Sequence, residues 1–496
     1  MSPRIVTAEQ AADLILEGST VAVDGFTMMG VAEEVYAAIE RSFLESGRPH
    51  GLTLVHASGQ ANRAAGLDHF AHRGLVARVV GSHWGLAPRM SALLGGDEVP
   101  GVCLPQGQLS TLYRAIAAGR PGNLSTVGIA TFVDPRVDGG RINHSARGMI
   151  APNTYVDVVT LDGRDYLRYK SFPIDVGILR ASAVDEAGNA SQSEEASGLD
   201  ALSLAQAVRN SGGFVICQAK QVVPRGAIAA REVSVPGTLI DYIVPVDDVD
   251  TGHRQTDSAT LDRALVSGFA TVDELSAALS STPVTRERAR VGERGARLVE
   301  PGDVINVGTG IPGDTIGGAL ARAGLLDQVT MTIESGVYDG LPLGGTDFGA
   351  ARNPSAIIGH AAQFDFYNGG GADIAFMGAG QVSGTGDVNV SVLGGRVIGC
   401  GGFIDILDGA RRICFLLSAG GRNRKFVDHV DHTTFSGQAA LAKDQQVYLA
   451  TEDVTLRLTA AGWVVHDLDP SVGTGDVLRN IPILTDSLER SSESKE

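Results

Sequence analysis

The sequence repeats one order of predicted elements in its two halves, and this repetition constrains the fold more than any other feature. Near the N-terminus, Thr7 and Gln10 have the spacing of a capping box, which predicts a helix that runs to Gly18. The apolar run 20–23 and a glycine follow. In the second half, the apolar run 303–307 leads to the glycine loop 308–310. Helix, strand and glycine loop in this order are typical of an α/β unit.

Two further pairs of segments support a duplication. The run LTLVHASG at 52–59 matches VTMTIESG at 329–336, and DEAGNAS at 185–191 matches GDVNVS at 386–391. The sequence therefore predicts an α/β protein with two duplicated open α/β domains. We expect an N-terminal domain over 1–280, a C-terminal domain over 281–486 and a disordered tail over 487–496. The polar stretch 271–291 is the expected linker.

Charge and cysteine content indicate which binding partners and which cellular compartment to expect. The net charge of −17 argues against non-specific binding to nucleic acid or to an anionic membrane. The four cysteines lack the spacing of a disulfide framework or a zinc cluster. Glu9 and Asp13 interrupt what would be the apolar run of a signal peptide, and no apolar stretch reaches the length of about 18 residues that a membrane span needs. We expect a cytoplasmic protein.

The segment Gly308-Thr309-Gly310-Ile311-Pro312-Gly313 has the form of a dinucleotide-binding loop. Pro312 removes one backbone donor, and the duplicate reads GFTMMG at 25–30. Three interpretations stay open: a NAD site, a turn without a ligand, and a loop that approaches another phosphorylated cofactor. The last of these is favoured.

Glu334 follows the predicted strand 329–333 and therefore lies at the carboxyl edge of a sheet, where open α/β folds place their chemistry. The duplicate copy has Ala57 at the matching position. A carboxylate in one copy only indicates function more than packing, although a surface glutamate is the alternative. The glycine loop 399–402 is suited to present backbone N–H groups to an oxyanion.

The sequence contains no motif for a serine nucleophile or for a metal site. Glu334-Ser335-Gly336 is not the serine nucleophile elbow. The pairs His69 and His72, and His429 and His432, have no third ligand nearby in the sequence, so we predict no metal site.

Several long segments resemble family I coenzyme A transferases of the single-chain acetate/propionate and 3-oxoacid type. In the second half they are 333–337, 344–358, 363–382 and 399–406, and in the first half 58–88, 104–122, 131–136 and 170–189. The resemblance covers about residues 5–470. It implies transfer of coenzyme A from a short-chain acyl-CoA to a carboxylic acid through a glutamyl-CoA thioester.

The resemblance also implies the residues of the site and the partners. Glu334 is the expected nucleophile, and Gly401 with Gly402 the expected oxyanion donors. The loop expected along the CoA consists of Val307, Gly308, Thr309, Gly310 and Ile311. CoA and acyl-CoA are expected as substrates, with no permanently bound cofactor. Small carboxylic acids are the other partners, and the protein is expected to form a homo-dimer or homo-tetramer.

Three alternatives to the transferase remain at this point. They are an acyl-CoA hydrolase on the same scaffold, a NAD-dependent oxidoreductase and a non-catalytic acyl-CoA-binding protein. The sequence does not identify the acyl group.

Overall fold

A computed structural model describes residues 3–149, 154–268, 270–281, 283–420, 425–473 and 481–484 of the chain. Within these residues, the first half forms an eight-stranded sheet in the order β1-β14-β12-β9-β2-β3-β4-β5, in which all neighbouring strands run parallel. The strands are β1 (Arg4–Ile5), β14 (Tyr242–Pro245), β12 (Phe214–Ala219), β9 (Val176–Ala181), β2 (Thr20–Val23), β3 (Leu52–His56), β4 (Val76–Gly81) and β5 (Gly101–Cys103). Every residue of β9 is buried, as expected for a strand covered on both faces.

Helices connect these strands, because parallel neighbours need crossover connections. The helices of the first half are α1 (Ala8–Asp13), α2 (Glu33–Ser46), α3 (Pro88–Gly95), α4 (Gln106–Ala117), α5 (His144–Arg147), α6 (Ala201–Asn210) and α7 (Val249–Gly252). A small antiparallel sheet contains β6 (Gly122–Ser125), β7 (Val156–Leu161) and β8 (Arg164–Lys170).

The second half forms another large sheet, ordered β20-β17-β16-β15-β21-β26-β28-β29-β30. Its central strands, from β16 to β28 in this order, are parallel, and its edges are antiparallel. The strands are β15 (Val304–Val307), β16 (Thr330–Ile333), β17 (Val337–Tyr338), β20 (Ala356–Ile357), β21 (Ile374–Met377), β26 (Arg412–Leu416), β28 (Gln446–Ala450), β29 (Val454–Thr459) and β30 (Gly462–Leu468). The helices are α8 (Val272–Ser281), α9 (Arg286–Ala296), α10 (Ile311–Ala323), α11 (His360–Asn368), α12 (Phe403–Gly409) and α13 (Gly437–Ala442).

The central strands of the two large sheets follow the same order, β14-β12-β9-β2-β3 in the first and β28-β26-β21-β15-β16 in the second, which confirms the predicted duplicated α/β fold. The parallel pair β2–β3 corresponds to the parallel pair β15–β16. The third pair of similar segments forms two equivalent small sheets. One is β11-β10-β13 (Ala190–Ser191, Ala183–Asp185 and Val222–Val223), and the other is β23-β22-β27 (Val388–Asn389, Gln381–Ser383 and Phe426–Val427).

Local details agree only in part with the sequence-based expectations. The capping box between Thr7 and Gln10 is present, but α1 ends at Asp13 instead of reaching Gly18. The stretch expected as a linker contains α8 and the first part of α9, and Leu279 of α8 packs in the same apolar cluster as Ile316 of α10. The domain limits of 1–280 and 281–486 remain predictions. The tail 487–496 lies outside the described residues.

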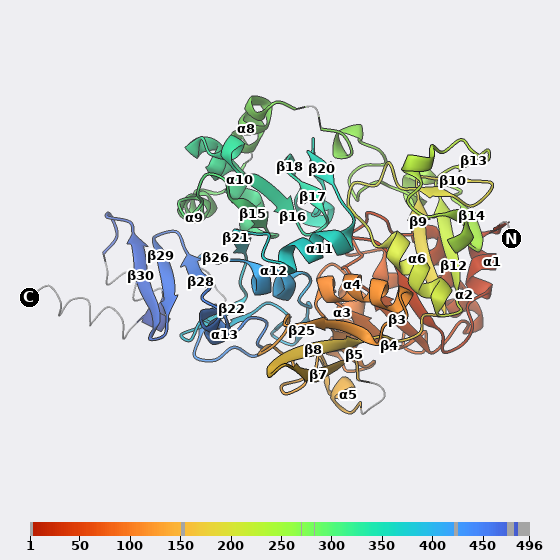
Figure 1. Ribbon diagram of the computed structural model, residues 1–496, viewed down its shortest axis with the longest axis horizontal. Coiled ribbons are helices and arrows are strands. Elements are labelled where there is room, and N and C mark those ends of the chain that lie inside the picture. Colours follow the sequence, from red (N-terminus) through yellow and green to blue (C-terminus); the bar gives the residue numbers. More distant parts are fainter. Residues whose placement is uncertain are drawn as a thin grey trace, which may run out of the picture.

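Helix α4 of the first half lies beside α11 and α12 of the second half (Figure 1). The backbone N–H of Gln106, the first residue of α4, donates to the carbonyl oxygen of Gly401 at 3.0 Å. The next N–H, of Gly107, donates to the carboxylate of Asp405 in α12 at 2.9 Å. These contacts bring the N-termini of α4 and α12 together, and the candidate site lies at this junction.

Among the described residues, no helix combines the length and the apolar character that crossing a membrane requires.

Candidate active site

Glu334 directly follows β16 and lines a cavity of about 430 Å³ to which both halves of the chain contribute. The first half supplies apolar and polar side chains and the second half mostly glycines and apolar side chains. The lining residues are Phe26, Thr27, Gly59, His83, Gly85, Leu86, Gln106, Gly308, Thr309, Glu334, Gly345, Phe348, Met377, Gly378, Ala379, Gly380, Val390, Leu393, Ile398, Gly399, Cys400, Gly401, Gly402 and Phe403. The predicted nucleophile therefore faces a cavity formed jointly by the two halves of the chain.

Burial changes the acidity of Glu334. Loss of solvation raises the pKa of its carboxyl group to about 7, against the opposing effects of the His360 charge and of the Gly402 backbone N–H. A carboxyl group with this pKa is half ionised near neutral pH, so a large fraction of it is available as a nucleophile.

Gly402 leaves room for this carboxylate. A Cβ atom at Gly402 would lie 2.3 Å from Oε2 of Glu334, which is far inside van der Waals contact. Only a glycine lets the backbone approach the carboxylate this closely, and the Gly402 N–H is the backbone donor that acts on Glu334.

The backbone N–H of Gly401, an expected oxyanion donor, has a partner within the protein. It donates to the carbonyl oxygen of Ser82 at 2.9 Å, so this donor is already used. Gly401 lines the cavity with a left-handed φ of 53°. Its position turns the chain so that the N–H of Gly402, not its own, approaches Glu334.

The loop predicted to lie along CoA is only partly in the cavity. Gly308 and Thr309 line it together with Glu334. Val307 is the buried last residue of β15, Gly310 caps α10 and Ile311 begins that helix, and none of these three is part of the lining.

Three polar residues of the site were not identified from the sequence. Gln106, whose role the sequence leaves undetermined, lines the cavity, and its Nε2 lies 2.9 Å from Nε2 of His360. Nδ1 of His360 lies 2.8 Å from the Oδ2 atom of Asp200. These residues come from α4, α11 and the residue before α6, so no short motif contains them.

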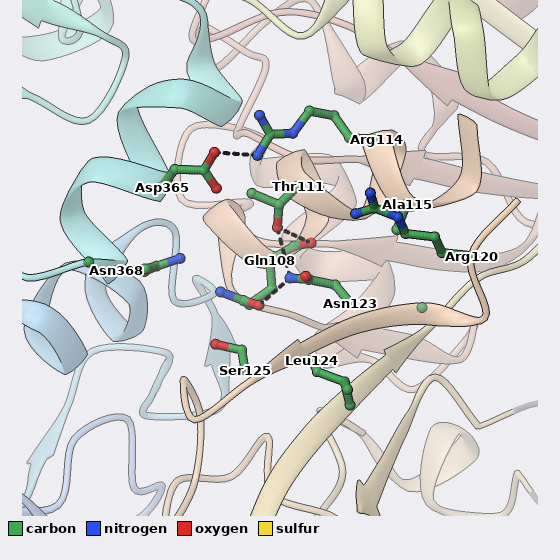
Figure 2. A pocket seen from close by; sticks show the side chains of 12 residues that line it. Gln108, Thr111, Arg114, Ala115, Arg120, Asn123, Leu124, Ser125, Asp365 and Asn368 are labelled. Carbon is green, nitrogen blue, oxygen red and sulfur yellow. Dashed lines mark hydrogen bonds and ion pairs between the residues drawn. The ribbon is translucent and has the colours of Figure 1, made fainter. Parts of the chain in front are cut away.

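A second and larger cleft, of about 690 Å³, lies between α4, β6 and α11 (Figure 2). Its side chains largely pair with one another: Arg114 forms an ion pair with Asp365, and Asn123 donates to Oε1 of Gln108 at 2.8 Å. We place the candidate active site in the cavity of Glu334, which contains a half-buried carboxylate beside a backbone donor.

The histidine pairs considered for metal binding lie elsewhere. His69 contacts the carboxylates of Glu33 and Glu40, and the ring of His432 packs on Phe132 with centroids 4.2 Å apart. In the part of the chain that the structure describes, no group of three or more potential metal ligands is found.

Comparisons with known proteins show the family of the chain. The family described as Coenzyme A transferase matches residues 5–245. The caffeate CoA-transferase of Acetobacterium woodii is 34% identical over 95% of this chain and 92% of that protein. The acetate CoA-transferase YdiF of Escherichia coli K12 is 32% identical over 94% of this chain and 90% of that protein.

A solved structure has the same fold. The acyl-CoA transferase YdiF of Escherichia coli O157:H7, as the apoenzyme, superimposes with a TM-score of 0.87 at 30% identity. The match covers 97% of this chain and 93% of the other. A thioester complex of that enzyme with CoA matches with the same score.

Proposed function

This chain belongs to the coenzyme A transferase family, and from that premise we propose that it transfers CoA from an acyl-CoA to a carboxylic acid through a thioester on Glu334. The observation that carries the proposal is the half-buried Glu334 carboxylate, which lines a cavity to which both halves contribute, with the Gly402 N–H beside it. The relative YdiF forms a thioester complex with CoA, which supports a covalent route.

The reaction begins when ionised Glu334 attacks the thioester carbonyl carbon of the acyl-CoA. The C–S bond breaks, CoA leaves as a thiolate, and the acyl group remains on Glu334 as a mixed anhydride. The thiolate then attacks the carbonyl carbon of the Glu334 side chain and expels the acyl group as a carboxylate. The product is a glutamyl-CoA thioester, and an incoming carboxylic acid reverses these steps to leave as its own CoA thioester.

Gly402 acts on the second of these steps. When the thiolate attacks Glu334, negative charge develops on a side-chain oxygen of Glu334, which lies against the Gly402 backbone. A fixed N–H at this place stabilises the charge without reorganisation. We assign this donor to Gly402 because the Gly401 N–H is bonded to Ser82.

The lining of the cavity points to acyl groups without a second charge. Among the described lining residues there is no lysine or arginine, and the side chains include Phe26, Phe348, Met377 and Leu393. A second carboxylate in the substrate would lie near ionised Glu334 without a cationic partner in the lining. We therefore favour short apolar monocarboxylates and 3-oxoacids over dicarboxylates as substrates.

We also propose a cytoplasmic homo-oligomer, a dimer or a tetramer, with no permanently bound cofactor. All four cysteines are free and buried, which fits a reducing compartment.

The decisive experiment is incubation with acetyl-CoA or propionyl-CoA in the absence of an acceptor, followed by peptide mass spectrometry. The peptide that contains 333–335 should gain the mass of CoA less water. Glu334→Gln should show no adduct and no exchange, whereas Glu300→Gln, which changes a surface carboxylate, should behave as the wild type. Labelling of another residue, or full activity of Glu334→Gln, would contradict the proposal.

A kinetic panel tests the substrate class and the hydrolase alternative together. Exchange with acetate, propionate and butyrate should give parallel double-reciprocal lines, and succinate should be a poor acceptor. Rapid CoA release without any acceptor acid would instead identify a hydrolase.

A further inference from the structure

The imidazole of His360 is held in a buried polar cluster behind the cavity. Both His360 and Gln106 are at most 2% exposed. Nδ1 of His360 faces a carboxylate oxygen of Asp200 at 2.8 Å, and the other oxygen of Asp200 accepts the hydroxyl proton of Ser110. Carboxylate oxygens accept hydrogen bonds, so the Nδ1 that faces Asp200 carries a hydrogen.

The other ring nitrogen decides how Gln106 is oriented. Nε2 of His360 is in hydrogen-bond contact with the side-chain amide of Gln106. A neutral ring with its hydrogen on Nδ1 accepts at Nε2, so it requires the NH₂ end of the amide. A doubly protonated ring donates at Nε2, so it requires the oxygen end. The two ends of a glutamine amide have nearly the same shape, and the hydrogen-bond network assigns them.

The end of the amide that does not face His360 is turned towards the cavity. Gln106 is part of the lining. Its Nε2 faces His360 and its Oε1 lies 3.8 Å from the position of a Cβ on Gly401, which is the orientation that a neutral His360 requires. An NH₂ group there is a hydrogen-bond donor for an oxyanion, whereas a carbonyl oxygen there repels one.

We propose that His360 is a positioning residue: held by Asp200, its protonated ring turns the NH₂ group of Gln106 into the cavity, and loss of its proton turns the carbonyl oxygen there. The inference rests on the proposed function, since it concerns the oxyanion formed when Glu334 attacks the acyl-CoA. It assigns this first oxyanion to Gln106, whereas Gly402 serves the glutamyl carbonyl.

The charges around His360 favour the protonated ring. Burial lowers the pKa of His360, but the carboxylates of Asp200, Glu334 and Asp24 together raise it above its usual value. The neighbouring rings are those of Phe26 and Phe364, with centroids 6.1 and 5.1 Å away.

Two further titratable groups, Tyr113 and Asp405, lie near the cluster. Tyr113 on α4 keeps its proton, because burial and the carboxylates of Asp200 and Asp24 raise its pKa. Asp405 on α12 accepts from Gly107 and Gln108 of α4. Burial raises the pKa of Asp405 to about 7, so the Gln106→Met profile is needed to separate its titration from that of His360.

The test is the pH dependence of kcat/KM for acyl transfer in the wild type and in Gln106→Met. The wild type should lose activity on the alkaline side as His360 loses its proton. Gln106→Met should be about 10²-fold slower, as expected for loss of one oxyanion donor, and should lack the alkaline limb because no amide is left to turn. Gln108→Met is the matched control, since it alters the other buried glutamine of α4, and it should keep the alkaline limb.

A double-mutant cycle provides the second measurement. His360→Asn should be slower than the wild type and should lack the alkaline limb. In the Gln106→Met background the same change should alter the rate less than twofold, because both variants remove one interaction. Persistence of the alkaline limb in Gln106→Met, or an equal effect of His360→Asn in both backgrounds, would overturn the inference.

Two controls separate this inference from the proposed function. Thermal unfolding of each variant identifies any loss of folding, and the Gln106→Met profile tests the inference even where His360→Asn does not fold. The CoA adduct on the wild-type 333–335 peptide tests the nucleophile, and its presence is independent of the shape of the alkaline limb.

Discussion

The backbone of Gly402 lies directly against the carboxylate of Glu334, so that a Cβ atom at position 402 would lie 2.3 Å from Oε2. Gly402→Ala should therefore displace the carboxylate and tilt the N–H that acts on it. We expect kcat to fall by about 10²-fold or more, the loss typical of one oxyanion donor. The measurement is steady-state kinetics together with the rate of CoA adduct formation.

Gly401→Ala is the natural control for this prediction. A Cβ at Gly401 has room, with its nearest neighbour 3.8 Å away, but the residue has a φ of 53°. The substitution should cost about 1 kcal/mol of stability through backbone strain and should change kcat much less than Gly402→Ala. A larger loss of kcat in Gly401→Ala would reverse the assignment of the donor.

The pH dependence of the first step follows from Glu334. Its pKa is raised to about 7, mainly by burial, so the carboxyl group is protonated and not nucleophilic below that pH. The rate of adduct formation should fall about tenfold for each pH unit below 7. Stopped incubations between pH 5 and pH 8, analysed by mass spectrometry, would measure this limb. A rate that stays constant down to pH 5 would show that the carboxylate is not the titrating group.

The loop that begins α10 offers a test of CoA binding. Gly310 has a φ of 81° with open space around its Cβ position, and Gly302, in a turn before β15, has a φ of 93° with equally open space. Alanine at either position should introduce similar backbone strain. Only Gly310→Ala should raise KM for acyl-CoA, by about tenfold, if the loop lies along the CoA. Equal KM values in both variants would remove Gly310 from the CoA site.

Arg180 and Glu195 form a buried ion pair in the first half of the chain. Arg180 and Glu195 are joined by two hydrogen bonds of 3.0 and 2.8 Å, and their side chains are 2% and 3% exposed. Glu195→Gln should lower the free energy of unfolding by about 3–5 kcal/mol, because an unpaired charge stays buried. Glu9→Gln, which breaks an exposed pair with Arg41, should change it by less than about 1 kcal/mol. Urea unfolding of both variants measures the difference.

The same pair predicts how stability depends on pH. Burial alone would raise the pKa of Glu195, but Arg180 and His253 lower it to about 2. Its stabilising contribution is therefore complete above about pH 4.5, the ordinary value, and is lost as the pH falls towards 2. Urea midpoints of the wild type should fall over this window, and those of Glu195→Gln should fall less.

The sequence by itself determined the elements that depend on local patterns. Apolar runs that stop at glycine predicted β2, β3, β15 and β16, and the repetition of these runs predicted the duplicated sheets. Glu334 was found in the same way, because a carboxylate at the end of an apolar strand is visible along the chain and is absent from the duplicate at Ala57.

Only the tertiary structure decided how the groups around Glu334 divide their roles. Gly401 and Gly402 are equivalent in the sequence, but the N–H of Gly401 is taken by Ser82, a residue more than 300 positions away. Gln106, Asp200 and His360 meet because the N-terminus of α4 packs on the second half of the chain. Hydrogen bonds between distant segments determine the partner of each donor. The spacing of residues along the chain does not show which carbonyl or carboxylate the fold brings to a given donor.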